Sequence, residues 1–224
     1  MSVGVFKKNS LRLLRLFIVV SLLPIIAINF TPSAFAFGSP FACDASLYQL
    51  SGGTLFKLNP ASNTFSQVGS APTVAGLDGI GLNPADNYLY GIVNGTTLQE
   101  FANDGTSIAA ASISGLTNKD GADFLSNDQM LAVSATNPTL QLITLHRTST
   151  AVTSTSITNV SLPGTSYTGA SDIAVYPGSG GVSQAYALSG TSLTIFSLNS
   201  TSPTTATTTT KNVSGLPSGV VRKF

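Results

Sequence analysis

From about residue 41 onward, polar and apolar residues alternate along short runs. Gly, Asn, Pro and Ser bound these runs, and no long stretch repeats its apolar residues with the 3.6-residue period of a helix. A period of two is that of a half-buried β-strand, because successive side chains point to opposite faces of a sheet. The pattern therefore predicts an all-β domain made of short strands joined by tight turns.

A hairpin pattern recurs four times along the chain. Each copy has a strand, a turn that contains Gly, Asn or small polar residues, and a second strand with Leu in its second position. The copies span residues 47–58, 89–101, 130–143 and 185–196. The leucines in the second position, Leu55, Leu98, Leu140 and Leu193, are 43, 42 and 53 residues apart. This spacing predicts an internal repeat.

Further strands flank each hairpin. A third strand follows each copy, at residues 64–68, 107–111, 151–156 and 204–210, although the last of these runs, rich in Thr, is equally typical of a glycosylated or flexible tract. A leading strand introduced by Gly and Asp precedes three copies, at residues 76–82, 121–125 and 169–175. Four strands in about 45 residues is the size of a propeller blade. The sequence therefore predicts a β-propeller-like fold of about four blades of four strands.

The first hairpin lacks a leading strand of its own. Residues 215–221 resemble such a lead-in, as expected where a ring closes with strands from both ends of the chain. Two alternatives stay open, a small closed ring and a truncated or incompletely closed piece of a larger one. A β-sandwich with chance similarity between hairpins is the rival architecture, and the regular spacing favours the propeller.

The first 36 residues have the features of a secretory signal peptide with an N-terminal signal helix. Four basic residues precede an apolar run over residues 16–30, and Ala34 and Ala36 occupy the positions that a signal peptidase recognises. We therefore predict a signal peptide at 1–36, a propeller-like domain at 37–224, and a secreted, extracellular or cell-surface protein. Cleavage would leave no stable membrane span. We interpret Cys43 as a buried free cysteine rather than a lipid-attachment site.

Cleavage also changes the charge. The whole chain has ten Lys and Arg against nine Asp and Glu, and the leader holds four of the basic residues and no acid. Six basic and nine acidic residues remain in the 188 that follow, a net charge of −3. Such a chain lacks the basic surface that phosphate backbones require, so the sequence predicts no nucleic-acid partner.

Three stretches resemble a known family. Residues 41–49, 54–60 and 81–91 are similar to a propeller-like domain family of unknown function found in secreted and cell-surface proteins, whose blade pattern is like that of quinoprotein-like and WD-type propellers. The similarity covers most of residues 41–200. It implies the architecture and carries no agreed activity.

Three acids near the leading strands are the candidate metal ligands. Asp78, Asp123 and Asp172 recur at corresponding places, and leading strands line the central channel of a propeller. Converging carboxylates are suited to a hard cation such as Ca²⁺. The alternative is that each Asp accepts hydrogen bonds from nearby backbone N–H groups in the turn that enters its strand, and that alternative is favoured.

Few other residues offer chemistry. His146, in a polar turn beside Arg147, is the single histidine, and Glu100 is the single glutamate. No G-x-S-x-G elbow, P-loop or dinucleotide fingerprint occurs. The sequence therefore favours a non-enzymatic module that binds an extracellular protein or glycan, without a cofactor. The alternative is a secreted metal-dependent hydrolase that uses the three Asp residues.

Overall fold

The structure is a computed structural model that describes residues 38–42, 46–51, 54–69, 74–148, 151–164, 167, 169–176, 183–200 and 202–214. The chain divides into two units, Met1–Ala36 and Phe37–Phe224, and all described residues belong to the second. The predicted signal peptide, Cys43 and the predicted closing strand at 215–221 lie outside the described residues. Within the described part, no helix is long and apolar enough to cross a membrane.

Four antiparallel sheets make up the described residues. The first sheet contains β1 (Tyr48–Ser51), β2 (Thr54–Asn59) and β3 (Thr64–Gln67). The second contains β4 (Leu77–Leu82), β5 (Leu89–Val93), β6 (Thr97–Phe101) and β7 (Ser107–Ser112). The third contains β8 (Gly121–Ser126), β9 (Gln129–Val133), β10 (Leu140–Arg147) and β11 (Val152–Val160). The fourth contains β12 (Ile173–Tyr176), β13 (Ser183–Ser189), β14 (Ser192–Leu198) and β15 (Ala206–Asn212).

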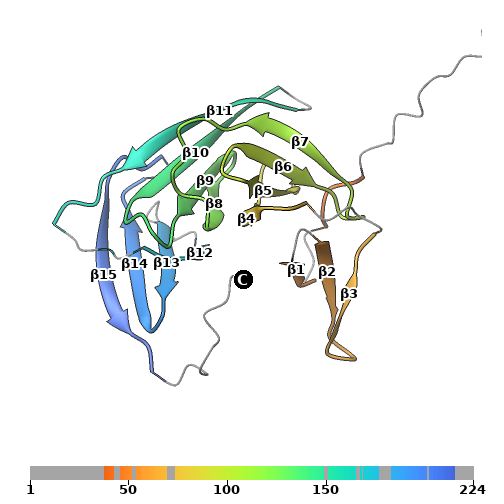
Figure 1. Cartoon of the computed structure of the whole chain (residues 1–224), viewed down its shortest axis with the longest axis horizontal. Helices are drawn as coiled ribbons and strands as arrows, with labels where there is room; N and C mark the ends of the chain where they lie inside the picture. Colours follow the sequence, from red (N-terminus) through yellow and green to blue (C-terminus); the bar gives the residue numbers. More distant parts are fainter. Residues whose placement is uncertain are drawn as a thin grey trace, which may run out of the picture. The chain divides into compact units, whose positions relative to one another are not determined.

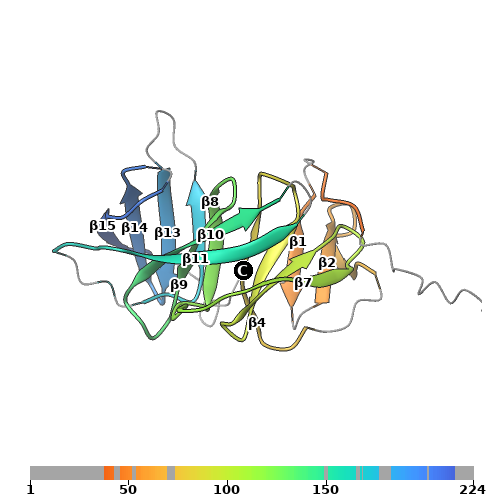
Figure 2. The same ribbon diagram turned by 90° about the horizontal axis from the view of Figure 1, so that it is seen from above.

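Each sheet is a meander in which neighbours in sequence are hydrogen-bonded neighbours in space. The sheets follow one another in a propeller arrangement, which confirms the predicted all-β fold of four blades (Figure 1). The first and fourth sheets lie at opposite ends of the row in both views (Figures 1 and 2). The first sheet has three strands within the described residues, because no leading strand precedes β1 there. The Thr-rich run forms the outer strand β15 rather than an irregular tract.

Two clusters of buried apolar side chains hold successive sheets together. One lies between the second and third sheets and includes Tyr90, Leu98 and Ile143. The other lies between the third and fourth sheets and includes Leu140 and Phe196. Side chains of the third sheet contribute to both clusters, because alternate residues along each strand point to opposite faces, one toward the second sheet and one toward the fourth. Burying both faces of a sheet requires apolar residues at consecutive positions, as along β9 and β10.

Glycine lets the leading strands of adjacent sheets approach closely. A Cβ at Gly121 on β8 would lie 2.5 Å from the Cα of Asp172, just before β12. A Cβ at Gly81 on β4 would lie 3.0 Å from the Cα of Asp123 on β8. The first contact is too short for any side chain, and the second is tight enough that a Cβ would require the neighbouring strand to shift. The glycines that mark the leading strands in the sequence therefore serve the packing between blades.

Candidate functional site

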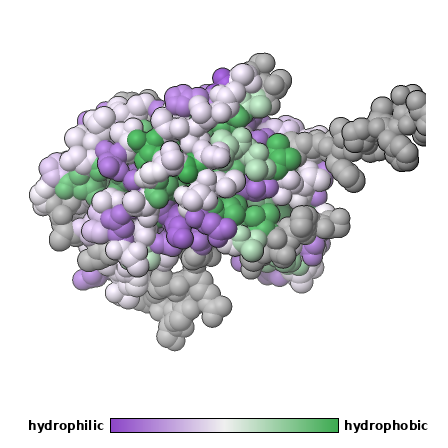
Figure 3. Space-filling view, turned by 45° about the horizontal axis from the view of Figure 1, so that its top comes forward, coloured by the Kyte–Doolittle hydropathy of each residue, from purple (hydrophilic) through white to green (hydrophobic). Residues whose placement is uncertain are grey.

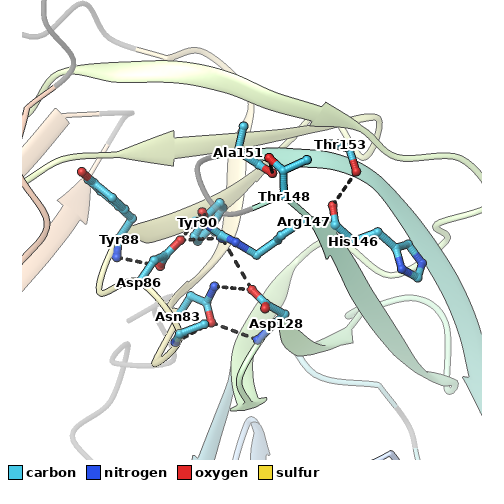
Figure 4. A network of polar contacts seen from close by, with 11 residues as sticks. Asn83, Asp86, Tyr88, Tyr90, Asp128, His146, Arg147, Thr148, Ala151 and Thr153 are labelled. Carbon is cyan, nitrogen blue, oxygen red and sulfur yellow. Dashed lines mark hydrogen bonds and ion pairs between the residues drawn. The ribbon is translucent and has the colours of Figure 1, made fainter.

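The main cluster of charged side chains joins the second sheet to the third (Figure 4). Asn83 and Asp86 lie in the loop between β4 and β5, and Asp128 lies in the turn between β8 and β9. Asn83 Nδ2 donates to Asp128 Oδ1 at 2.9 Å, and the Asp128 backbone N–H donates to Asn83 Oδ1 at 3.0 Å. Asp128 has a positive φ of 60°, a conformation that Asp and Asn adopt more readily than most residues. The tight turn thus presents Asp128 to the neighbouring loop.

Arg147, the last residue of β10, completes this cluster. Its Nη1 lies 2.5 Å from Asp86 Oδ2 and 3.5 Å from Asp128 Oδ1. The same nitrogen donates to the Tyr90 hydroxyl at 2.8 Å, and that hydroxyl donates to Asp86 Oδ2 at 2.6 Å. Asn83, Asp86, Tyr90, Asp128 and Arg147 are called the inter-sheet clasp below. The clasp connects three separate segments through charge-assisted hydrogen bonds, which are stronger than neutral ones.

Burial sets the ionisation behaviour of the clasp. Tyr90 is fully buried, and its desolvation, with a further contribution from its hydrogen bond to Asp86, raises its pKa well above the ordinary tyrosine value. Arg147 opposes that shift. Glu100 on β6 is also buried, and desolvation followed by repulsion from Asp86 raises its pKa. Tyr90 therefore stays a neutral donor, and Arg147 is the cation that compensates the acids around it.

The clasp is built for positioning rather than for reaction. Asp86 Oδ1 accepts the Tyr88 N–H at 3.0 Å while Oδ2 accepts from Tyr90 and Arg147. Both polar atoms of the buried Asn83 side chain are likewise used. A network of side chains with several polar atoms engaged across two sheets holds those sheets in register. Sequence reasoning missed this cluster, although residues 83–88 belong to the stretch 81–91 that carries the family resemblance.

Two of the three predicted metal ligands, Asp78 and Asp123, pair at different positions along their hairpins. Asp78 pairs with Ile92 beside a β-bulge, whereas Asp123 pairs with Leu131, the counterpart of Tyr90, two positions nearer the turn that joins its leading strand to the hairpin. Asp172 precedes β12 altogether. Asp123 and Asp172 are close enough to repel, because Asp172 contributes to the raised pKa of Asp123. Acids that correspond in the sequence, Asp78 and Asp123, thus differ in the hairpin residue with which they pair.

Asp123 has a well-defined structural environment. One of its oxygens accepts the N–H of Val175 on β12 at 2.7 Å, and the other accepts the N–H of Phe124 at 2.8 Å. Asp172 likewise accepts the N–H of Ile173 at 2.8 Å. Desolvation raises the pKa of Asp123 to about 6, against the two backbone hydrogen bonds. The bonds from Phe124 and Ile173 come from adjacent backbone N–H groups, whereas the bond from Val175 joins the third sheet to the fourth.

Within the described residues, no group of three His, Cys, Asp or Glu side chains is placed to hold a metal ion. The Ca²⁺ site at Asp78, Asp123 and Asp172 stays a prediction. His146 lies on β10 rather than in a turn, and its exposed ring Nε2 is 3.0 Å from Ser156 Oγ across the sheet. That contact is an ordinary cross-strand pair.

A hollow of about 390 Å³ opens where β14 ends and β15 begins. Its seven described lining residues are all uncharged and combine apolar surface with hydroxyl and amide groups: Pro163, Ser197, Leu198, Asn199, Thr205, Ala206 and Thr207. On the face shown in Figure 3, polar and apolar residues lie side by side. The hollow is therefore a candidate site for an uncharged ligand.

A comparison with known families finds a match that covers most of the chain. The profile of a family described as a repeat of unknown function, DUF6923, matches residues 45–221. No curated protein matches the chain. The matched range contains all four sheets, the inter-sheet clasp and the hollow.

Proposed function

We propose that this chain, which belongs to the DUF6923 family of repeats of unknown function, is a secreted, non-enzymatic propeller-like module. The module would bind an uncharged extracellular ligand. Secretion rests on the signal-peptide pattern of residues 1–36. The binding role rests on the uncharged hollow beside β14 and β15.

The composition of the hollow favours a neutral glycan over a charged ligand. Pro163 supplies exposed apolar surface, and Asn199 Nδ2 donates to Thr205 Oγ1 at 3.2 Å on the polar side. Sites of this kind use apolar area for affinity and a few polar groups for orientation. A ligand rich in hydroxyl groups can exchange hydrogen bonds with these side chains without the desolvation of a charge.

The charged residues support the same conclusion in another way. Arg147, Asp86 and Asp123 are engaged in contacts between sheets. Their role as fixed scaffold leaves hydroxyl and amide groups to make the contacts with a partner. A module of this type recognises its ligand through shape and neutral hydrogen bonds.

The test is an array of immobilised neutral oligosaccharides probed with the purified whole chain. The protein is produced without N-glycosylation, because Asn199 begins an Asn-Ser-Thr sequon. Asn199→Trp, which fills the hollow, should reduce binding at least about tenfold. Asn127→Trp, an equal change at an exposed turn, should leave binding unaltered. No binding to any neutral glycan, or binding that both variants retain, would contradict the proposal.

A further inference from the structure

The outer face of the fourth sheet carries apolar side chains that serve neither core cluster. One face of β13 and β14 packs into the cluster shared with the third sheet. The opposite face presents four side chains that are absent from both clusters: Tyr186, Leu188, Leu193 and Ile195. Tyr176 on β12 shares this face, because it pairs with Gln184 across the sheet, and it is 63% exposed. These five residues are called the leading face below.

The repeat shows what such a face does elsewhere in the molecule. The residues of the third sheet that correspond to Tyr186, Leu188, Leu193 and Ile195 are Leu131, Val133, Leu140 and Leu142. All four lie in the core cluster that the third sheet forms with the fourth. In the second sheet the corresponding residues Tyr90, Ile92 and Leu98 lie in the cluster formed with the third. At these positions each sheet therefore packs against the sheet that follows it.

The first sheet carries the complementary surface. In the third and fourth sheets, the residues that pack back against the preceding sheet include Met130 and Ile143, and Ala185 and Phe196. The corresponding residues of the first sheet are Leu47 and Leu58. Leu47 is 61% exposed, and Phe65, which pairs with Leu58, is 48% exposed. Leu47, Leu58 and Phe65 are called the trailing face below.

We propose that the leading face of one copy of this chain packs on the trailing face of a second copy. The occupant is a second copy because the leading face has the side-chain pattern that sheets of this repeat use to bind the next sheet. Among the described strands, the main packed pairs between sheets join successive sheets, β4 with β8, β8 with β12 and β7 with β11. The two faces lie at opposite ends of the row of sheets (Figures 1 and 2).

The geometry of the contact fixes the kind of assembly. The two faces differ, so the contact between copies is heterologous. When the leading face of each of two copies packs on the trailing face of the other, the two copies form a ring with two identical junctions. The leading face contains no charged residue, and neither does the trailing face. Burial of apolar side chains therefore drives the association, which should depend little on salt.

The test measures the mass of the purified whole chain in solution by light scattering during size-exclusion chromatography. Twice the chain mass is expected. Tyr176→Arg and Leu47→Arg change exposed residues on the two faces, and each should weaken association at least about tenfold. Ile108→Arg is the matched control, because Ile108 is 45% exposed on β7, outside both faces. Circular dichroism checks that every variant keeps its strand content.

A mixing experiment identifies the head-to-tail arrangement. A Tyr176→Arg copy keeps an intact trailing face, and a Leu47→Arg copy keeps an intact leading face. An equimolar mixture should therefore recover dimers through one intact junction, although neither variant dimerises alone. A monomeric wild-type chain, a dimer that both substitutions leave intact, or a mixture that stays monomeric would each overturn the proposal.

Discussion

Replacing Arg147 with Met should weaken the junction between the second and third sheets. The substitution keeps the aliphatic length of the side chain and removes the cation that Asp86, Asp128 and the Tyr90 hydroxyl share. Removing one partner of a fully buried ion pair costs about 3–5 kcal/mol, because the other charge is left without compensation. The side chains of Arg147 and Asp86 keep 15% and 13% of their exposure, so water reduces this cost. We expect a loss of about 2 kcal/mol.

The assay is equilibrium unfolding in urea together with thermal unfolding, in which this loss corresponds to a fall in Tm of roughly 4–8 °C. Lys119→Met, which removes an exposed cation, is the control and should stay within about 0.5 kcal/mol of the wild type. A double-mutant cycle with Asp86→Asn should give a coupling energy of about 1–2 kcal/mol. An Arg147→Met protein as stable as the Lys119→Met control would refute the view that the clasp holds these sheets together.

Three further predictions concern the junction between the third and fourth sheets. The pKa of Asp123 is raised from 3.8 to about 6, so the folded state binds the proton of this carboxyl more tightly than the unfolded state does. The free energy of unfolding should therefore fall by at most about 3 kcal/mol as the pH rises from 4 to above 6. Asp123→Asn should flatten this pH dependence, which urea titrations measure. Gly121→Ala should cost about 2–3 kcal/mol in thermal unfolding because its Cβ meets the backbone of Asp172, whereas Gly115→Ala, with open space around it, should cost only about 1 kcal/mol through its positive φ. Millimolar Ca²⁺ should leave Tm unchanged, since both oxygens of Asp123 already accept N–H groups; a rise that Asp123→Asn abolishes would support the metal site instead.

The sequence was sufficient to predict the strands and their grouping into sheets. Alternation and turn residues are local properties, so the hairpins and the leading strands follow directly from the pattern. The relation of the three acids was harder, because β-bulges lie between Asp78 and Ile80 and between Phe124 and Ser126. A bulge adds a residue to one strand and shifts the register of everything beyond it. Asp78 and Asp123 follow Gly at similar places in the sequence but therefore pair at different positions along their hairpins.

The inter-sheet clasp was beyond the reach of local pattern. Arg147 and Tyr90 are 57 residues apart, and the contact exists only because the turn after β8 and the loop after β4 meet at the same edge. Nothing about an isolated arginine at the end of a strand indicates an inward contact, since most arginines are solvated. The loop at residues 83–88 gave no distinct signal either, because Asn and Asp are common in connecting turns.

The single glutamate connects the repeat to the clasp. Glu100 occupies the position that Leu142 holds in the third sheet and Ile195 holds in the fourth. At that position each sheet faces the next, so the repeat directs a carboxylate into the junction between the second and third sheets. Burial there raises its pKa, and Arg147 supplies the opposing charge. The junction between the second and third sheets therefore combines an apolar cluster with charged contacts, and a polar contact of fixed geometry allows fewer alternative alignments than apolar packing does. We expect the clasp to select which sheet packs against the second sheet, a specificity that the uniform leucine pattern alone does not provide.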